Sequence, residues 1–225
     1  MRILVDSGEH QLVDKGRIAR IEITLARLRE LWPDAEIGLL TDQLTQANLF
    51  FPGVTPVPYS GPGGWPDGVH AGLLKMQGPE LGLDGTPLAL GAQSLRGSID
   101  TDPPALRTAP RGVADADLIV SAARGDLSDL TPEEVDQTLG ILEAALRAGR
   151  RAAMFGQAFG PLEHPELASR AAAILPRLEM ITVREGVRSP RTLGLLGVPA
   201  DRITMTGDDA FELVAENRVE SEGLD

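Results

Sequence analysis

The segments RILVDSG (residues 2–8), GRIARIEITLARLRELW (16–32) and EIGLLT (36–41) decide the fold class of this chain. The first and third are short apolar runs of the length of a strand. The middle segment has apolar residues at helical spacing: Ile18, Ile21, Leu25, Leu28 and Leu31. Together the three segments predict a strand–helix–strand unit with a short return loop.

The same alternation of apolar runs and helical patterns continues along most of the sequence. Further strands are predicted at 117–123, 151–156, 180–185 and 202–207, and further helices at 131–149, 165–178, 189–197 and 208–217. In the helix 131–149, Thr131 is predicted as the N-cap and Glu134 as the residue that completes a capping box. Roughly six strands, most of them followed by a helix, predict an α/β fold: a Rossmann-like parallel sheet with helices on both faces.

Residues 1–215 are predicted to form one Rossmann-like domain. Within it, residues 50–112 hold a large share of the prolines and glycines and are predicted to be an irregular insert. Such an insert is either a functional loop or a surface excursion, and the sequence leaves both open. Residues 216–225 are predicted to be an acidic tail or the start of an interdomain linker.

Composition narrows the possible functions and partners. The formal charge of −12 argues against a nucleic-acid or anionic-membrane partner, because phosphate backbones and headgroups select clustered Lys and Arg. The chain has no cysteine, and its three histidines are scattered, so we predict no metal site and no cofactor. It shows neither a signal peptide nor the roughly 20 apolar residues of a transmembrane segment, and we expect a cytoplasmic location.

Several motifs of nucleotide and hydrolase chemistry are absent from the sequence. There is no P-loop, no Gly-x-Gly-x-x-Gly fingerprint after the first strand, and no Gly-x-Ser-x-Gly nucleophile elbow. These absences count against nucleotide hydrolases, dinucleotide-dependent dehydrogenases and α/β-hydrolases.

Ligands of open parallel sheets bind at the carboxyl ends of the strands, and polar residues follow the predicted strands there. In MFGQAFGPL (154–162), an apolar run ends at Gly156 and Gln157 follows. Gly156 either closes a tight turn or lets a ligand approach the main chain, and both interpretations are open.

Two charged pairs at other strand ends also have alternative interpretations. Arg184 suits a carboxylate or phosphate, but its spacing favours a pair with Glu185 on a solvated edge. The Asp208-Asp209 pair favours an N-cap for the helix 208–217 over a metal site.

Five ordered segments together resemble the polysaccharide pyruvyl transferase family. They are ADLIVSAARGD (116–126), GQAFGPL (156–162), REGVRS (184–189), LLGVPADRI (195–203) and DDAFELV (208–214). The run LRELWPDAEIGLLT (28–41) fits as well. Two turns depart from the family pattern: Asp14 and Arg17 replace an expected Asn and Asp, and residues 121–125 lack the expected consecutive glycines.

The resemblance implies a fold, a reaction and a set of site residues. The family resembles GT-B glycosyltransferases, with two Rossmann-like domains facing a cleft, and this chain resembles the N-terminal one. Family members transfer the enolpyruvyl group of phosphoenolpyruvate to sugar hydroxyls of cell-surface polysaccharide. The substrate-binding residues implied are Gly156, Gln157, Gly160, Arg184, Glu185, Ser189, Asp208, Asp14, Gly16, Gly125 and Asp126. Arg184 would hold the phosphate or carboxylate of the donor, and Ser189 would donate a hydrogen bond.

By this resemblance the chain is the acceptor-side half of a transferase, completed by a C-terminal domain or a second chain. One alternative is a non-catalytic binding or scaffold module, which the altered turns favour. Another is half of a GT-B nucleotide-sugar glycosyltransferase. Exposed apolar side chains between residues 184 and 211 would support a missing partner domain, whereas a uniformly polar surface there would favour a self-sufficient module.

Overall fold

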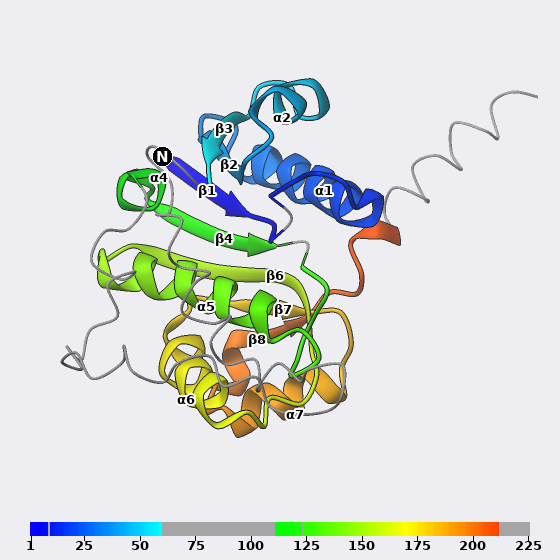
Figure 1. Cartoon of the computed structure of the whole chain (residues 1–225), viewed down its shortest axis with the longest axis vertical. Helices are drawn as coiled ribbons and strands as arrows, with labels where there is room; N and C mark the ends of the chain where they lie inside the picture. The colour runs from blue at the N-terminus through cyan, green and yellow to red at the C-terminus, as the bar shows by residue number, and fades with distance from the viewer. Residues whose placement is uncertain (9, 60–110, 123, 212–225) are drawn as a thin grey trace, which may run out of the picture.

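The computed structural model describes residues 1–8, 10–59, 111–122 and 124–211 (Figure 1). Within these residues it has eight strands: β1 (Arg2–Asp6), β2 (Glu36–Thr41), β3 (Thr55–Pro58), β4 (Leu118–Ala122), β5 (Asp126–Leu127), β6 (Arg151–Phe159), β7 (Ile181–Val183) and β8 (Ile203–Met205). All strand pairs are parallel, in the order β3-β2-β1-β4-β6-β7-β8, and the short β5 pairs with β6. This confirms the predicted Rossmann-like α/β sheet.

The strand order reverses direction between β1 and β4, which lie side by side in the middle of the sheet. In doubly wound sheets, this reversal opens a crevice at the carboxyl ends of the two strands, and ligands bind there. The residues that follow β1 and β4 are therefore the first place to look for a site.

Helices cover both faces of the sheet, as predicted, because alternate strand residues are apolar on both sides (Figure 1). Ile3 and Val5 face a core that includes α1 (Lys15–Leu31) and α2 (Leu44–Phe50). Leu4, between them, faces the opposite core. That core includes α4 (Arg111–Asp115), α5 (Pro132–Arg147), α6 (Pro165–Ile174) and α7 (Arg188–Leu195).

The predicted end of the strand at Gly156 was wrong, because β6 continues through Gln157 to Phe159. Gly156 adopts φ +60° inside the strand, and the pairing of β6 with β7 shifts register between Met154 and Gln157. Glycine at φ above zero is the usual residue of such a bulge. A bulge redirects the strand without ending it, which an apolar run followed by Gly-Gln does not reveal.

The irregular segment predicted at 50–112 begins later than expected, because β3 lies within it. Both Pro56 and Pro58 belong to β3, which is an edge strand where a missing N–H is tolerated. The prolines of this segment therefore led to the prediction of an irregular insert where a strand is present. Residues 60–110 and the tail 216–225 lie outside the described residues.

The helices predicted at 16–32, 131–149, 165–178 and 189–197 are present with small changes at their ends. Most of the helix predicted at 208–217 lies outside the described residues. The predicted capping box was wrong. Thr131 stands at the N-cap of α5 without a side-chain capping bond, and its hydroxyl donates instead to the carbonyl oxygen of Asp126 (2.9 Å). The Glu134 carboxylate accepts from Arg17 of α1 (2.7 Å). A tertiary ion pair thus replaces the local motif.

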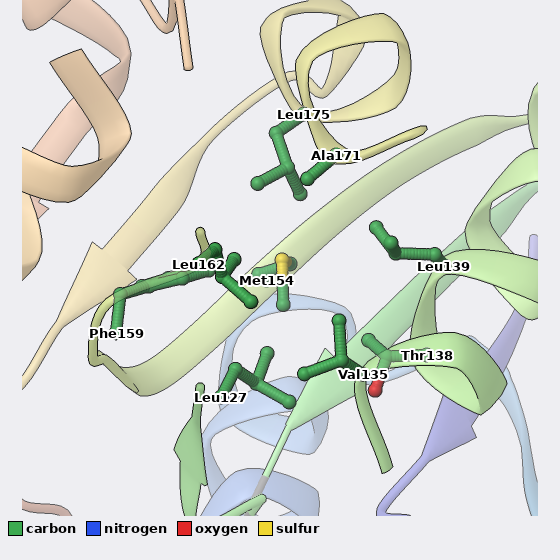
Figure 2. Close-up of a pocket in the computed structure, with 9 residues that line it drawn as sticks. All are labelled: Leu127, Val135, Thr138, Leu139, Met154, Phe159, Leu162, Ala171 and Leu175. Atoms are coloured by element: carbon green, nitrogen blue, oxygen red, sulfur yellow. The ribbon is translucent and has the colours of Figure 1, made fainter. Parts of the chain in front are cut away.

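A small apolar cavity lies in the core between α5, α6 and β6 (Figure 2). Its lining side chains are Leu127, Val135, Thr138, Leu139, Met154, Phe159, Leu162, Ala171 and Leu175. The hydroxyl of Thr138 donates to the carbonyl oxygen of Glu134 (2.7 Å), and the other lining side chains are apolar. The cavity is therefore a packing void of the core. No helix within the described ranges is long and apolar enough to span a membrane.

Candidate functional site

The crevice between β1 and β4 is filled by a buried ion pair of the chain itself. Arg124 and Asp6 have fully buried side chains, and Arg124 Nη2 lies 2.9 Å from Asp6 Oδ2. Gly8 (φ +66°) packs on the guanidinium so closely that an added Cβ would lie 2.5 Å from Arg124 Cζ. Arg124 Nη1 also donates to the carbonyl oxygen of Glu134 (3.1 Å). The usual ligand crevice of the sheet is thus occupied by protein.

Two aromatic rings lie behind this pair. His10 Nε2 lies 3.1 Å from Asp6 Oδ1, and its ring stacks on Tyr59 at a centroid distance of 3.5 Å. Burial raises the pKa of Asp6, but the charge of Arg124 and the contacts with His10 outweigh it and hold that pKa well below its ordinary value. Burial and the nearby Asp6 charge raise the pKa of Tyr59. Asp6 is therefore ionised in the interior, and Arg124 is the fixed cation that compensates it.

A second ionic cluster lies at the same edge of the sheet, nearer to solvent. Asp208, which follows β8, accepts hydrogen bonds from Arg20 of α1 at 3.0 Å (Nε to Oδ1) and 3.3 Å (Nη2 to Oδ2). Arg184, which follows β7, donates from Nη1 to Asp208 Oδ2 at 3.1 Å. Burial disfavours the charged carboxylate, but hydrogen bonds from Arg20, from the Ala210 N–H and from Arg184 lower the pKa of Asp208 to about 2.

The neighbouring Asp209 covers the Gly156 bulge. Asp209 Oδ1 lies 2.6 Å from Arg27 Nη1 of α1, and its side chain is buried. An added Cβ on Gly156 would lie 2.5 Å from Asp209 Oδ2. In Figure 1 the segment after β8 (orange-red) runs across to α1, where these contacts hold it. The main chain at Gly156 therefore faces a carboxylate of the protein.

Replacing Gly156 by alanine is expected to destabilise the protein by about 2 kcal/mol or more. An L-residue at φ +60° costs roughly 1–2 kcal/mol, and the new methyl group must also displace Asp209 from Arg27. Urea unfolding measures this loss. Gly140→Ala is the matched control, because a Cβ there meets nothing within 4 Å in the interior of α5. This control is expected to stabilise by roughly 0.5–1 kcal/mol. Equal effects of the two variants would contradict the strained bulge.

The predicted partner of Arg184 was wrong, because Arg184 pairs with Asp208 and not with Glu185. The carboxylate of Glu185 instead accepts the N–H groups of Val187 and Arg188 (both 2.8 Å) and of Ser189 at the start of α7. Hydrogen bonding from the Ser189 side chain and from these N–H groups lowers the pKa of Glu185 to about 2. Glu185 is thus a helix-capping residue in this conformation.

The remaining residues of the β6–α7 motifs have structural contacts. Ser189 is buried, and its hydroxyl accepts from the Phe159 N–H (2.9 Å), which ties α7 to β6. Gln157 is buried, and its amide nitrogen donates to the carbonyl oxygen of Phe155 (3.0 Å). An added Cβ on Gly160 would lie 2.5 Å from Ser128 Cβ, so close packing selects glycine there.

The residues of the two altered turns lie around the edge of the site. Asp14 caps α1 by accepting the N–H of Arg17 (2.8 Å), and Gly16 is the second residue of that helix. The carbonyl oxygen of Gly125 accepts from Arg184 Nη2 (2.8 Å). Asp126 Oδ2 lies 3.5 Å from Arg188 Nη2. Gly125 is thus joined directly to Arg184, whereas Asp14 and Gly16 form a helix start.

The N-cap interpretation of Asp208 is supported, and the same residue does more than was predicted. Its Oδ1 accepts the Ala210 N–H (3.0 Å), and both carboxylate oxygens also accept hydrogen bonds from arginines: Oδ1 from Arg20 and Oδ2 from Arg184. Within the described residues, no group of three or more His, Cys, Asp or Glu side chains is placed to hold a metal ion.

Sequence reasoning missed the arginines of α1 and the buried Arg124. One signal was available: Arg20 and Arg27 stand seven residues apart, and so on one helix face, in the helix that follows β1. Their partners could not be read from the sequence, because Asp208 and Asp209 stand more than 180 residues further on.

Buried polar atoms without a hydrogen-bond partner gather at this edge of the sheet. Among the described residues they include Ser121 Oγ, Arg124 Nε, Asp126 Oδ1, Gln157 Oε1 and Arg184 Nε. Buried polar groups are normally satisfied by protein, water or ligand. The edge therefore has hydrogen-bonding capacity that the chain's own side chains leave unused.

A family model described as polysaccharide pyruvyl transferase matches residues 20–223. The match spans every motif at the carboxyl edge after residue 20, including Arg184 and Asp208. Comparison with curated proteins and with solved structures gives no match.

Proposed function

Because the chain belongs to the polysaccharide pyruvyl transferase family, we propose that it takes part in transferring the enolpyruvyl group of phosphoenolpyruvate to a cell-surface polysaccharide. It supplies the acceptor-side half of the active site and the arginine that holds the donor. A second domain or chain supplies the rest of a GT-B-like cleft, and the reaction takes place in the cytoplasm.

The observation that carries this proposal is the pair of guanidinium groups at the carboxyl edge of the sheet. Arg20 and Arg184 both bind the carboxylate of Asp208, so this place accommodates an anion with two or more oxygen acceptors. Phosphoenolpyruvate has a carboxylate and a phosphate, both of which arginine recognises through paired N–H donors.

In the proposed reaction, the methylene carbon of phosphoenolpyruvate is protonated and its C2 carbon becomes cationic. Two hydroxyl groups of one sugar form bonds to C2, and the bond from C2 to the phosphate oxygen breaks, so the enolpyruvyl unit ends as a pyruvate ketal of the sugar. One hydroxyl proton balances the proton taken up by the methylene carbon, and the other leaves with inorganic phosphate. Arginines near the departing phosphate stabilise the negative charge that develops on it.

Exposed apolar side chains support a partner for this edge of the sheet. Val187, Met205 and Phe211, which follow or end strands β7 and β8, are 81%, 64% and 75% exposed. An added Cβ on Gly186 would lie 3.0 Å from Met205 Sδ, so the loop after β7 and the end of β8 are adjacent. Apolar groups gathered beside a polar site are typical of an interface.

A non-catalytic module of the same family is the second candidate, and one observation favours it. The chain's own side chains occupy two places where a ligand would lie: Arg124 fills the β1–β4 crevice, and Asp209 covers Gly156. A family member that has lost its substrate would show the same filling.

A ligand-induced melting shift with phosphoenolpyruvate separates these two functions. At ligand ten times its Kd, the native state gains about 1.4 kcal/mol, which raises the midpoint by about 3–6 °C. Arg184→Ala is expected to abolish the shift, because it removes a donor-holding guanidinium. Arg191→Ala, an exposed arginine on α7, is the matched control and is expected to keep the shift. The absence of any shift in the unaltered chain at millimolar ligand would support the non-catalytic module instead.

A further inference from the structure

The Asp208 carboxylate contacts Arg20 and Arg184 in the way that a bound anion would. Arg20 approaches both carboxylate oxygens from α1, and Arg184 approaches one of them from the end of β7. Arg184 is also positioned by the carbonyl oxygen of Gly125 (2.8 Å). The two guanidinium groups thus come from separate elements and converge on a single point at the edge of the sheet.

The charges at this point do not balance. Two guanidinium cations face one carboxylate, and within the described residues Asp208 is the only carboxylate paired with either of them. The side chains of Arg20, Arg184 and Asp208 are 19%, 16% and 22% exposed, so solvent screens the excess cation only in part. Arg184 Nε is buried and has no acceptor. A phosphoryl dianion, with two charges and three terminal oxygens, would neutralise both arginines and can supply the missing acceptor.

Asp208 is also easier to move than the arginines. Residues 206–208 belong to neither helix nor strand, and Gly207 has φ +86°. A Cβ added to Gly207 would meet nothing within 4 Å beyond its chain neighbours. Arg20 lies within the 17-residue helix α1, and Arg184 directly follows the paired strand β7. An incoming anion can therefore replace Asp208 while the arginines stay in place.

We propose that Arg20 and Arg184 form a phosphoryl-binding site that Asp208 occupies at rest, and that a ligand phosphate binds by displacing the Asp208 carboxylate. The inference rests on the proposed function in taking a phosphorylated donor as the natural competitor. It adds Arg20 to the donor site and makes the segment after β8 sensitive to ligand.

The test is a calorimetric titration of the full chain with inorganic phosphate at constant low ionic strength, which measures the apparent Kd. If Asp208 holds the arginines about nine-tenths of the time, the apparent Kd is weakened about tenfold. Asp208→Asn preserves the shape and removes the charge, so it is expected to bind phosphate about tenfold more tightly. Asp208→Ala is expected to show the same gain in phosphate affinity, and it replaces Asp208→Asn in the test if the asparagine variant folds poorly.

Two matched variants separate this effect from a general change in charge. Asp209→Asn removes the same charge one residue away but leaves Arg20 and Arg184 occupied, and its phosphate affinity is expected to change less than about threefold. The double variant Arg20→Gln/Asp208→Asn is expected to lose the gain. Equal gains in the Asp208 and Asp209 variants, or a gain that survives in the double variant, would overturn the proposal, as would unchanged affinity in both Asp208 variants.

The same variants distinguish a failure of this inference from a failure of the proposed function. Phosphoenolpyruvate that binds the unaltered chain through Arg184, but no more tightly in Asp208→Asn, would overturn the displacement and leave the donor role intact. Phosphate binding that gains about tenfold in Asp208→Asn and depends on Arg20, without any shift from phosphoenolpyruvate, would support the site and contradict the donor role.

Discussion

Replacing Arg124 by alanine is expected to lower the free energy of unfolding by about 3–5 kcal/mol. Arg124 and Asp6 are fully buried, 2.9 Å apart, and the variant leaves the Asp6 carboxylate in the interior without its cation. Neither side chain of the pair is exposed to solvent in the folded chain, so hydration compensates little of this loss. Urea unfolding at neutral pH measures the change.

The control for Arg124 is an ion pair of the same kind at the surface. Arg151→Ala removes the partner of Glu179 (3.2 Å), and both side chains of that pair are exposed. Exposed pairs contribute about 0–1 kcal/mol, so this variant is expected to unfold almost as the unaltered chain does. A loss below about 1 kcal/mol in Arg124→Ala as well would show that Asp6 is hydrated or neutral in the folded state.

The same ion pair makes the stability of the fold depend on pH. The pKa of folded Asp6 lies below its ordinary value of 3.8, so its ionised form stabilises the fold above about pH 4, and this contribution is lost as the pH falls. Asp208 and Glu185, each with a pKa of about 2, add losses of the same sign between about pH 4 and 2. In Arg124→Ala the part that belongs to Asp6 is expected to diminish, which unfolding series at pH 7 and pH 3 measure.

Replacing Phe159 by alanine is expected to cost about 3–5 kcal/mol. Phe159 is buried at the end of β6, where it lines the small cavity together with Met154 and Leu162 (Figure 2). The variant would join the existing void to the space that the ring leaves. The resulting larger cavity has few side chains free to fill it. Urea unfolding measures the loss.

Phe50→Ala is the corresponding change at a half-exposed site. Phe50 ends α2 and contacts the ring of Phe51 at its edge, with a centroid distance of 6.2 Å. Its replacement is expected to cost less than about 1 kcal/mol. If the two phenylalanine variants lost equal stability, the end of β6 would not be the tightly packed core position that the structure describes.

The carboxyl edge was predictable as a location, but only in part as a set of contacts. Arg184, Gly125 and Asp208 were predicted to lie at this edge, and the structure joins all three through the Arg184 guanidinium. Arg184 remains a candidate for substrate binding, whereas in the proposed site Asp208 is the group that competes with the ligand for the arginines. Ser189 and Gly160 were placed in the same site by resemblance, but their contacts in the structure hold β6 against its neighbours.

The sequence by itself determined the parallel α/β sheet and the family of this chain. Apolar periodicity reports which residues must be buried locally, and strands and helices follow from that burial along a continuous segment. Only the tertiary structure decided which charges meet. Arg124 pairs with Asp6 across 118 residues, and Arg20 with Asp208 across 188. An ion pair depends on distance through space, and that distance is set only when separate strands and helices pack together, so no local pattern encodes it.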